Sequence, residues 1–387
     1  MYPKRIHRRI RATVFTLSMV SLLGAAFAED GSKANLPAAV APVLAANQYQ
    51  QKNLVSNLPG KADKTDPNLV NPWGLSRSSG SPWWASDNGT GLSTLYSGDG
   101  TIAPLVVKIP PSDPNVSSTG KPTGTVFNGS TEFELATGKS AVFMFVSEDG
   151  AISGWNPTVQ QTSAVIKVNQ KTKSIFKGAT IATLNGAQRG THNYLYAADF
   201  HQGRVEIFDG KFQRTMVLEN NFANQSIPAG YAPFNVQNIG GNIYVTYAKQ
   251  DADKEDEVAG AGFGFVNVYS TTGQFLRKLE RGSWFNAPWG VTQAPSDFGP
   301  YSHYILVGNF GSGQIAAFDP VTGAFQDFLR DATSKPIVID GLWALSFGND
   351  ATAGPATTLY FTAGPNDEHN GLFGSLTALK NPLGNGQ

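Results

Sequence analysis

Short apolar runs recur along this chain, and polar or turn-forming residues separate them. Three kinds of run follow one another in a fixed order, first seen as "NPWGLS", "WWASDNG" and "STLYSGDG" and last seen as "GLWALSF", "LYFTAGPNDE" and "GSLTAL". Gly, Asp, Asn or Pro bounds each run, which is typical of half-buried strands joined by tight turns. The pattern therefore predicts an all-β chain built from short strands.

The ordered set of runs returns six times. One position inside the first run of each unit marks the period, and it is occupied by Gly74, Gly124, Gly178, Asn235, Gly290 and Ala344. The steps between these positions are 50, 54, 57, 55 and 54 residues. Repeats of this length with several short strands each are typical of β-propeller blades, whereas a two-sheet sandwich does not explain six returns of one order. We predict a six-bladed β-propeller with blades of about 54 residues.

The two ends of the repeat array complement each other. The sixth unit ends near Leu379 after its third strand, and a strand-like segment, "QYQQKNLVS" at residues 48–56, precedes the first unit. We expect this segment to supply the missing outer strand, so that the ring closes without an open edge. The predicted propeller then spans residues 49–380, with a tail at residues 381–387.

The first residues resemble an export signal. A basic head is followed by an apolar run over residues 12–26 and by Ala26, Phe27 and Ala28, the layout of a secretory signal peptide cleaved near Ala28. The apolar run is too short for a permanent membrane span. We predict a signal peptide at residues 1–28, a flexible leader at residues 29–48 and a secreted or periplasmic protein. The paired arginines leave both the general and the twin-arginine export routes open.

Net charge and composition limit the classes of binding partner that we expect. Loss of the five basic residues of the signal leaves 24 basic against 29 acidic residues, a net charge of −5. Nucleic acids and anionic membranes bind basic surfaces, so neither is an expected partner. No later apolar run approaches the length of a membrane span, and the chain has no Cys. We expect a monomer that binds a small molecule, a peptide or a polysaccharide.

Several longer sequence motifs resemble those of a known family. "NPWG", "YAKQDADK", "DGLW" and "FTAGPNDE" are similar to words in a family of exported bacterial proteins of uncharacterised function, related in style to NHL-repeat propellers. The resemblance covers residues 49–378 and implies an extracytoplasmic propeller, but it brings no reaction and no catalytic residues. Asn235 departs from the Gly or Ala of the other blades.

Polar side chains are predicted to gather on one face. In a propeller, the loop between the second and third strands of a blade lies on the same face as the loop that starts the next blade. These loops hold Asp87, Asp149, Asp199, His201, Asn309, Asp340 and Asp367, which we predict to line a ligand site. Asp340 directly precedes an innermost strand and is our candidate for a buried carboxylate with a perturbed pKa.

Aromatic residues divide into periodic and irregular positions. Trp73, Trp289 and Trp343 recur at one place in three blades, and we predict that they fill space between blades. Trp284 is irregular and is a candidate for stacking on a ligand.

A charge-dense segment in the fourth unit is a candidate metal-binding site. Seven charges fall within the nine positions 249–257, in a loop that we place between the second and third strands. Asp251, Asp253 and Glu255 alternate, as suits a hard cation such as calcium. Asp256 and Gly262 stand where an EF-hand needs Gly and Glu, so that motif is rejected. A looser calcium site and a solvated loop both stay open.

Two functions compete at this level. The favoured hypothesis is an exported binding or scaffold propeller that holds a ligand over the acidic face, with a calcium ion. The alternative is a divalent-metal-assisted hydrolase or lactonase with its ion near the axis. The candidate ligands of that ion are Asp199, Asn235, Asn309 and Asp340. Neither a G-x-S-x-G motif nor a P-loop occurs.

Overall fold

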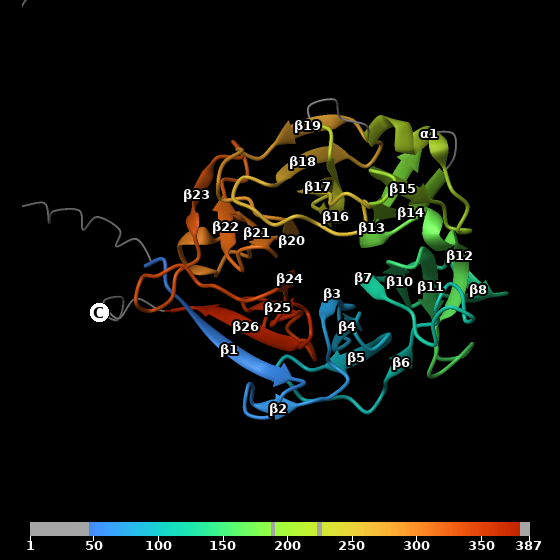
Figure 1. The fold of residues 1–387 in the computed structure, drawn as a ribbon, viewed down its shortest axis with the longest axis horizontal. Coiled ribbons are helices and arrows are strands. Elements are labelled where there is room, and N and C mark those ends of the chain that lie inside the picture. Colours follow the sequence, from blue (N-terminus) through green and yellow to red (C-terminus); the bar gives the residue numbers. More distant parts are fainter. Residues whose placement is uncertain (1–45, 187–189, 223–226, 380–387) are drawn as a thin grey trace, which may run out of the picture. The chain divides into compact units, whose positions relative to one another are not determined.

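Antiparallel sheets arranged around one axis make up the fold (Figure 1). This computed structural model describes residues 46–186, 190–222 and 227–379. The described part of the chain contains six blade sheets and one small hairpin, which confirms the predicted six-bladed β-propeller. The predicted signal peptide and tail lie outside the described residues, as does nearly all of the leader. No helix in the described part is long and apolar enough to cross a membrane.

The first three blades differ in their outer strands. Blade 1 contains β3 (Pro72–Ser76), β4 (Trp83–Asp87), β5 (Leu92–Tyr96) and β6 (Val107–Lys108). Blade 2 contains β7 (Pro122–Phe127), β10 (Phe143–Ser147), β11 (Ala151–Trp155) and β12 (Val165–Asn169), with a hairpin of β8 (Glu134–Ala136) and β9 (Lys139–Ser140). Blade 3 contains β13 (Phe176–Gly186), β14 (Gly190–Asp199) and β15 (Arg204–Phe208). The short helices α1 (Met216–Glu219) and η2 (Asn220–Phe222) follow β15 at the outer edge of blade 3 (Figure 1).

The last three blades each have at least four strands. Blade 4 contains β16 (Tyr231–Ile239), β17 (Asn242–Lys249), β18 (Phe265–Ser270) and β19 (Phe275–Lys278). Blade 5 contains β20 (Pro288–Gln293), β21 (Ile305–Asn309), β22 (Ile315–Phe318) and β23 (Phe325–Phe328). Blade 6 contains β24 (Leu342–Phe347), β25 (Leu359–Ala363), β26 (Leu372–Ala378) and β1 (Tyr49–Ser56), with β2 (Lys64–Thr65) beside β1.

The N-terminal strand closes the ring. β1 pairs antiparallel with β26 from Tyr49 opposite Ala378 to Ser56 opposite Leu372. Figure 1 shows this first strand lying on the outer side of the last blade. Because β1 covers the edge that β26 would leave open, the predicted closure is confirmed. The two-residue β2 pairs parallel with β1.

The small residues of the repeat allow the innermost strands to touch. A Cβ added to Gly74 would collide with the Thr123 carbonyl of the next blade, and one added to Gly290 would meet the Trp343 carbonyl. The pairing between the first and second strands shifts register beside these positions. Asn235, which departs from the repeat, donates its side-chain N–H to the Trp289 carbonyl at 2.8 Å. Its amide therefore links blades 4 and 5 across this close approach.

Aromatic rings from several blades meet in one buried cluster. Trp73 stacks on Trp343 with ring centroids 3.5 Å apart, and Trp289 meets Trp73 edge-on at 6.1 Å. Phe200 and Phe234 join the same cluster. Because its members come from blades 1, 3, 4, 5 and 6, the cluster lies where the blades converge. The periodic tryptophans do fill space between blades, and they do so at the axis.

Candidate functional site at the centre of the acidic face

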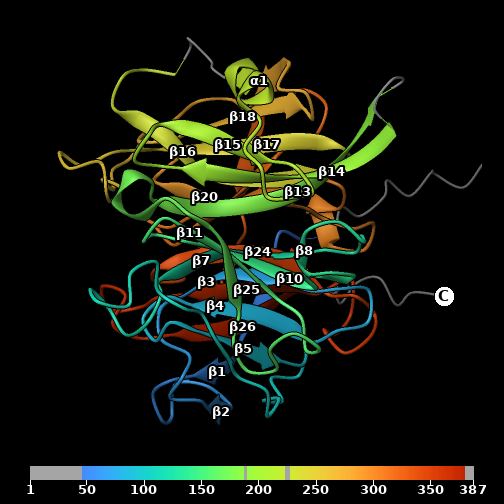
Figure 2. The ribbon, with the colours of Figure 1, turned by 90° about the vertical axis from the view of Figure 1, so that its right-hand side faces the viewer.

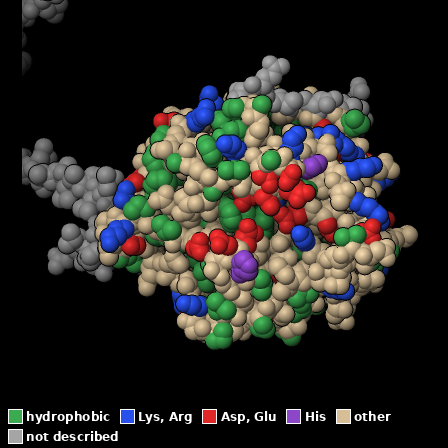
Figure 3. All heavy atoms as spheres, viewed as in Figure 1, with side chains coloured by type: hydrophobic (Ala, Val, Ile, Leu, Met, Phe, Trp, Pro, Cys, Tyr) green, Lys and Arg blue, Asp and Glu red, His purple; other side chains and the backbone are tan. Residues whose placement is uncertain are grey.

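Acidic side chains gather near the middle of the face seen in Figure 3. Four acidic residues form one interacting group, which we call the axial acid cluster: Glu148, Asp256, Glu257 and Glu368. Glu148 follows β10, Asp256 and Glu257 follow β17, and Glu368 follows β25. These are the loops between second and third strands of blades 2, 4 and 6, so the predicted gathering of such loops on one face brings distant acids together.

A buried lysine holds the axial acid cluster. Lys177 is 0 % exposed near the start of β13, and its Nζ lies 2.5 Å from Glu148 Oε1 and 3.0 Å from Asp256 Oδ1. The same ammonium lies 4.9 Å from the ring centroid of Trp73 and 5.8 Å from that of Phe200, which adds cation–π attraction. The aromatic cluster at the axis is therefore the floor of the site.

Electrostatics keep this lysine charged. Burial alone would lower the pKa of Lys177, but Glu148, Glu257 and Asp256 outweigh burial and raise the pKa above its ordinary value. The ammonium is thus a permanent cation, and we exclude it as a neutral amine nucleophile at physiological pH.

Two acids of the cluster, Glu257 and Glu368, also have raised pKa values, which favours their neutral form. Burial raises the pKa of Glu257 to about 8 against the opposing effect of Lys177, so this carboxyl group is mostly protonated at neutral pH. Burial also raises the pKa of Glu368, although its Oε2 accepts a hydrogen bond from the Asn71 side chain at 2.5 Å. Perturbed pKa values concentrated in one place are typical of functional sites, although structural ion pairs also produce them.

The charge-dense loop turns back on itself to deliver two of these acids. An isolated β-bridge joins Gln250 to Glu257, and the Asp251 N–H donates to the Asp256 carbonyl at 2.9 Å. This closure directs the end of the loop to Lys177, while Asp253 near its tip is exposed.

The predicted calcium ligands do not form a coordination shell. The Asp251 carboxylate accepts the Glu255 N–H of its own loop at 2.9 Å, and Asp253 and Glu255 are exposed. Within the described ranges, no group of three or more His, Asp or Glu side chains is placed to hold a metal ion. These three residues do not fit a calcium site in this arrangement, and a calcium ion elsewhere stays a prediction.

A polar hollow of about 660 Å³ adjoins the axial acid cluster. Six carboxylates and two lysines belong to its wall, namely Asp113, Glu148, Asp149, Glu255, Asp256, Glu368, Lys121 and Lys171. Asn88 also lines it and donates to Glu148 Oε2 at 2.7 Å. Asp149, one of the predicted ligand residues, accepts the Ser112 N–H at 2.7 Å, and burial raises its pKa. The excess of carboxylates gives this concave surface a negative charge.

Three predicted ligand residues lie inside the blades instead. Asp87, Asp199 and Asn309 are all 0 % exposed. Asp199 Oδ1 accepts the backbone N–H groups of Ile175 and Gln202 at 3.2 and 3.1 Å. The structure corrects their placement on a ligand-facing surface: because each ends a second strand, its side chain turns inward.

The other two of these side chains have comparable local partners. Asp87 Oδ2 accepts the Thr94 hydroxyl at 2.8 Å, and Asn309 Oδ1 accepts the Asn286 N–H at 2.9 Å. Burial raises the pKa of Asp199 to about 6 and that of Asp87 well above its usual range. These groups brace the blades and their connecting loops.

The prediction that Asp340 is a buried carboxylate is wrong. Asp340 is exposed, and its Oδ2 accepts the Asn366 N–H at 2.9 Å. Gly341, with φ 66°, turns the chain between Asp340 and β24, so the carboxylate stays outside the core.

Trp284 is used for packing. Its ring stacks on Phe325 of β23 with centroids 4.3 Å apart, and its N–H donates to the Glu280 carbonyl at 2.9 Å. The ring face that we predicted to contact a ligand thus covers an outer strand of blade 5.

His201 and Asp367 lie beside the site rather than within it. His201 Nδ1 is 3.3 Å from the Lys254 carbonyl oxygen, at the edge of the charge-dense loop. Asp367 is exposed in a left-handed run from Asn366 to Glu368, with φ between 49° and 63°. That turn places the neighbouring Glu368, which the sequence predicts on the same face, in the axial acid cluster.

Lys177 was the main residue that sequence reasoning missed, although the repeat contains its signal. It directly precedes Gly178, as Trp73, Trp289 and Trp343 directly precede the small residues of their own blades. A lysine at a position that is aromatic in other blades indicates a cation placed in the axial aromatic cluster.

Fold and site together define a β-propeller protein with a negatively charged site at one end of its axis. No family model matches the chain. It is 30% identical over 353 residues to "Uncharacterized protein L690" of Acanthamoeba polyphaga mimivirus, covering 87% of each chain, and it belongs to the same family. It is also 29% identical over 351 residues to "Uncharacterized protein R648" of the same virus, covering 87% of this chain and 82% of the relative.

Among solved structures, the chain resembles that of a streptogramin B lyase. The TM-score is 0.48 at 12% sequence identity, over 86% of this chain and 97% of the lyase. This is a likeness of fold alone. The relatives reported above are viral, so the predicted bacterial, exported origin stays a prediction.

Proposed function

We propose that this propeller is a binding protein that holds a cationic small molecule or peptide in the polar hollow of its acidic face. The observation that carries the proposal is the excess of carboxylates over lysines in the wall of a concave surface of about 660 Å³. Pockets of this size suit small ligands, and ammonium and guanidinium groups form strong, charge-assisted hydrogen bonds with carboxylates.

The cluster behind the hollow supports this proposal through preorganisation. Glu148 and Asp256 are held by Lys177, which is fully buried, and Glu148 is also held by Asn88. Side chains already fixed in position lose little conformational entropy when a ligand binds. Glu255 also lines this wall and is exposed, whereas Asp113 is paired there with Lys171.

Calorimetric titration with spermidine tests the proposal. We expect saturable binding that weakens as salt is added, because exposed charges are screened. Glu368→Gln and Glu255→Gln should each weaken binding, by about threefold for the exposed Glu255. Glu134→Gln on the β8–β9 hairpin removes an exposed acid outside this wall and serves as the matched control. Equal binding by the two wall variants and the native protein would overturn the proposal.

The sequence-based hypotheses of a calcium ion and of a metal-assisted hydrolase are tested separately. Thermal unfolding is measured after EDTA treatment and again after calcium, zinc or manganese is added. Binding to the folded state raises the midpoint. A shift with calcium alone supports a calcium-assisted binding protein, a shift with zinc or manganese supports the hydrolase, and no shift removes both.

A further inference from the structure

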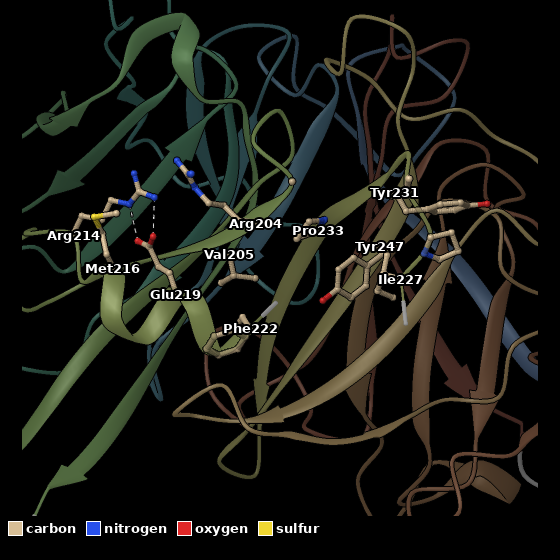
Figure 4. A pocket seen from close by; sticks show the side chains of 13 residues that line it. Arg204, Val205, Arg214, Met216, Glu219, Phe222, Ile227, Tyr231, Pro233 and Tyr247 are labelled. Atoms are coloured by element: carbon tan, nitrogen blue, oxygen red, sulfur yellow. Dashed lines mark hydrogen bonds and ion pairs between the residues drawn. The ribbon is translucent and has the colours of Figure 1, made fainter. Parts of the chain in front are cut away.

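A second hollow, of about 450 Å³, lies between blades 3 and 4 (Figure 4). Its wall comes from the start of β15, from α1 and η2, from residues 227–229, and from β16 and β17. None of its lining residues belongs to the wall of the polar hollow described above. It is therefore a separate candidate site.

Two arginines, Arg204 and Arg214, lie at one end of this hollow, and each donates hydrogen bonds to a carboxylate. Figure 4 shows the guanidinium groups of Arg204 and Arg214 near each other, with Glu219 bonded to Arg214. Arg214 donates from Nε and a terminal nitrogen to the two oxygens of Glu219, at 2.7 Å each. Arg204 donates from Nε and one terminal nitrogen to Glu206 Oε1, at 3.1 and 2.8 Å.

The carboxylates that hold these arginines are inside the protein. The side chain of Glu206 is 0 % exposed and that of Glu219 is 5 % exposed, whereas the side chain of Arg204 is 40 % exposed. A guanidinium has five N–H donors, and the second terminal nitrogen of Arg204 takes no part in its pair with Glu206. Arg204 thus offers oriented donors to the hollow at little entropic cost.

The opposite wall is apolar. Val205, Phe222, Ile227 and Tyr231 line it together with Tyr247. The Tyr247 hydroxyl lies 2.9 Å from the Tyr269 hydroxyl, so the polar end of this side chain is already paired. A hollow with an apolar wall and a few fixed polar groups is the usual form of a small-molecule site.

We propose that this second hollow binds a small carboxylic acid with an aromatic or branched apolar body. The ligand carboxylate accepts hydrogen bonds from the terminal nitrogen of Arg204 that its pair with Glu206 leaves unused. Arg214, whose three guanidinium nitrogens contact Glu219 and Glu206, lies beside Arg204 and adds local positive charge. The apolar body lies against Phe222, Ile227 and Tyr231. Because Glu206 and Glu219 already balance both arginines, the recognition comes from oriented hydrogen bonds rather than from a net positive charge.

Calorimetric titration of the full chain with 3-phenylpropionate tests this site. The matched probes are 3-phenylpropanol, which has the ring without the charge, and 3-phenylpropylamine, which reverses the charge. We expect saturable binding of the acid and much weaker binding of the other two. Arg204→Gln should weaken acid binding about tenfold, because it removes hydrogen bonds to a charged group.

Two further variants keep the test decisive. Arg330→Gln removes an arginine that donates to both oxygens of Asp327 in blade 5, and it should leave acid binding unchanged. Ile227→Ala should weaken acid and alcohol alike, because it reduces the apolar contact. Circular dichroism confirms that each variant is folded, and Arg204→Lys replaces Arg204→Gln if the latter unfolds. Absence of acid binding, or equal binding of acid and alcohol, would overturn the proposal.

Discussion

Two groups of carboxylates follow the second strands of this propeller and act in different ways. Asp87 and Asp199 end their strands and turn into the blades, where neighbouring hydroxyl or N–H groups bond to them. Glu148 follows the end of β10 by one residue and Asp256 follows β17 by several, and both meet Lys177 at the axis. The comparison shows that the position of an acid relative to its strand end decides whether it braces a blade or faces the site.

The largest effect should come from removing the cation of the axial acid cluster. Lys177→Met leaves Glu148, whose side chain is 17 % exposed, without its fully buried partner, and it also removes the contact with the exposed Asp256. We expect the free energy of unfolding to fall by about 3–5 kcal/mol, measured by urea denaturation. Lys171→Met, which breaks a pair with Asp113 in which the lysine is exposed, is the matched control and should change stability by less than about 1 kcal/mol. Equal losses in the two variants would show that the cluster does not depend on Lys177.

Replacing Asp199, which lies inside the blades, should lower the free energy of unfolding and leave ligand binding at the proposed site unchanged. Asp199→Ala leaves the Ile175 and Gln202 N–H groups without their acceptor, so we expect a loss of about 1–3 kcal/mol in denaturant titrations. Spermidine should bind the folded variant with native affinity. A clear loss of affinity would place Asp199 within the ligand site. The distinction between carboxylates inside the blades and carboxylates at the axis would then be wrong.

The protonated acid of the cluster should produce a pH dependence of stability. Burial raises the pKa of Glu257 from 4.5 to about 8 in the folded state, so the folded protein keeps a proton that the unfolded chain has released. The free energy of unfolding contributed by this group therefore falls as pH rises between these values and is constant above them. Lys177, Asp256 and Glu368 are the charged groups that face it.

Glu257→Gln should remove that fall. We expect the variant to gain stability relative to the native protein, by up to about 1.4 kcal/mol for each pH unit, as the pH of the denaturation buffer is raised from about 5 to about 8. A difference between the two proteins that does not change with pH would contradict the raised pKa. Glu134→Gln, an exposed acid, is the control for the general effect of removing one carboxylate.

The smallest effect is expected at the tip of the charge-dense loop. Asp253 is exposed, so Asp253→Asn should change the free energy of unfolding by less than about 0.5 kcal/mol. The midpoint of thermal unfolding measures this with and without calcium. A calcium-dependent shift that Asp253→Asn abolishes would restore the loop as a metal site.

Much of the fold was predictable because its signals are local and periodic. Gly74 and Gly290 mark innermost strands that must touch the next blade, and the segment at residues 48–56 had no partner other than the incomplete sixth blade. The third blade was less predictable, because a helix and a 3-10 turn, rather than a fourth strand, follow β15.

The sequence predicted on which face of the propeller the site lies, but it did not predict which side chains point into that site. Loop positions correctly indicated where acids gather, yet Asp87 and Asp199 turned inward and Asp340 stayed outside the core. Side-chain direction at a strand end depends on local twist and on the neighbouring loop, and neither is encoded in the spacing of residues. Glu148 and Glu368 were predicted to lie on this face, but Asp149 and Asp367 beside them were selected as the site residues, so the sequence indicated the loops and did not rank the acids within them.

By itself, the sequence determined the number of blades, their order and the strand that closes the ring, because repetition and alternation of apolar residues are properties of the chain. Only the tertiary structure decided that Lys177 lies over Trp73 and that acids from two other blades bond to it. The reason is physical: burial and charge pairing depend on distances between residues far apart in the chain, and those distances exist only once the blades have packed around their axis.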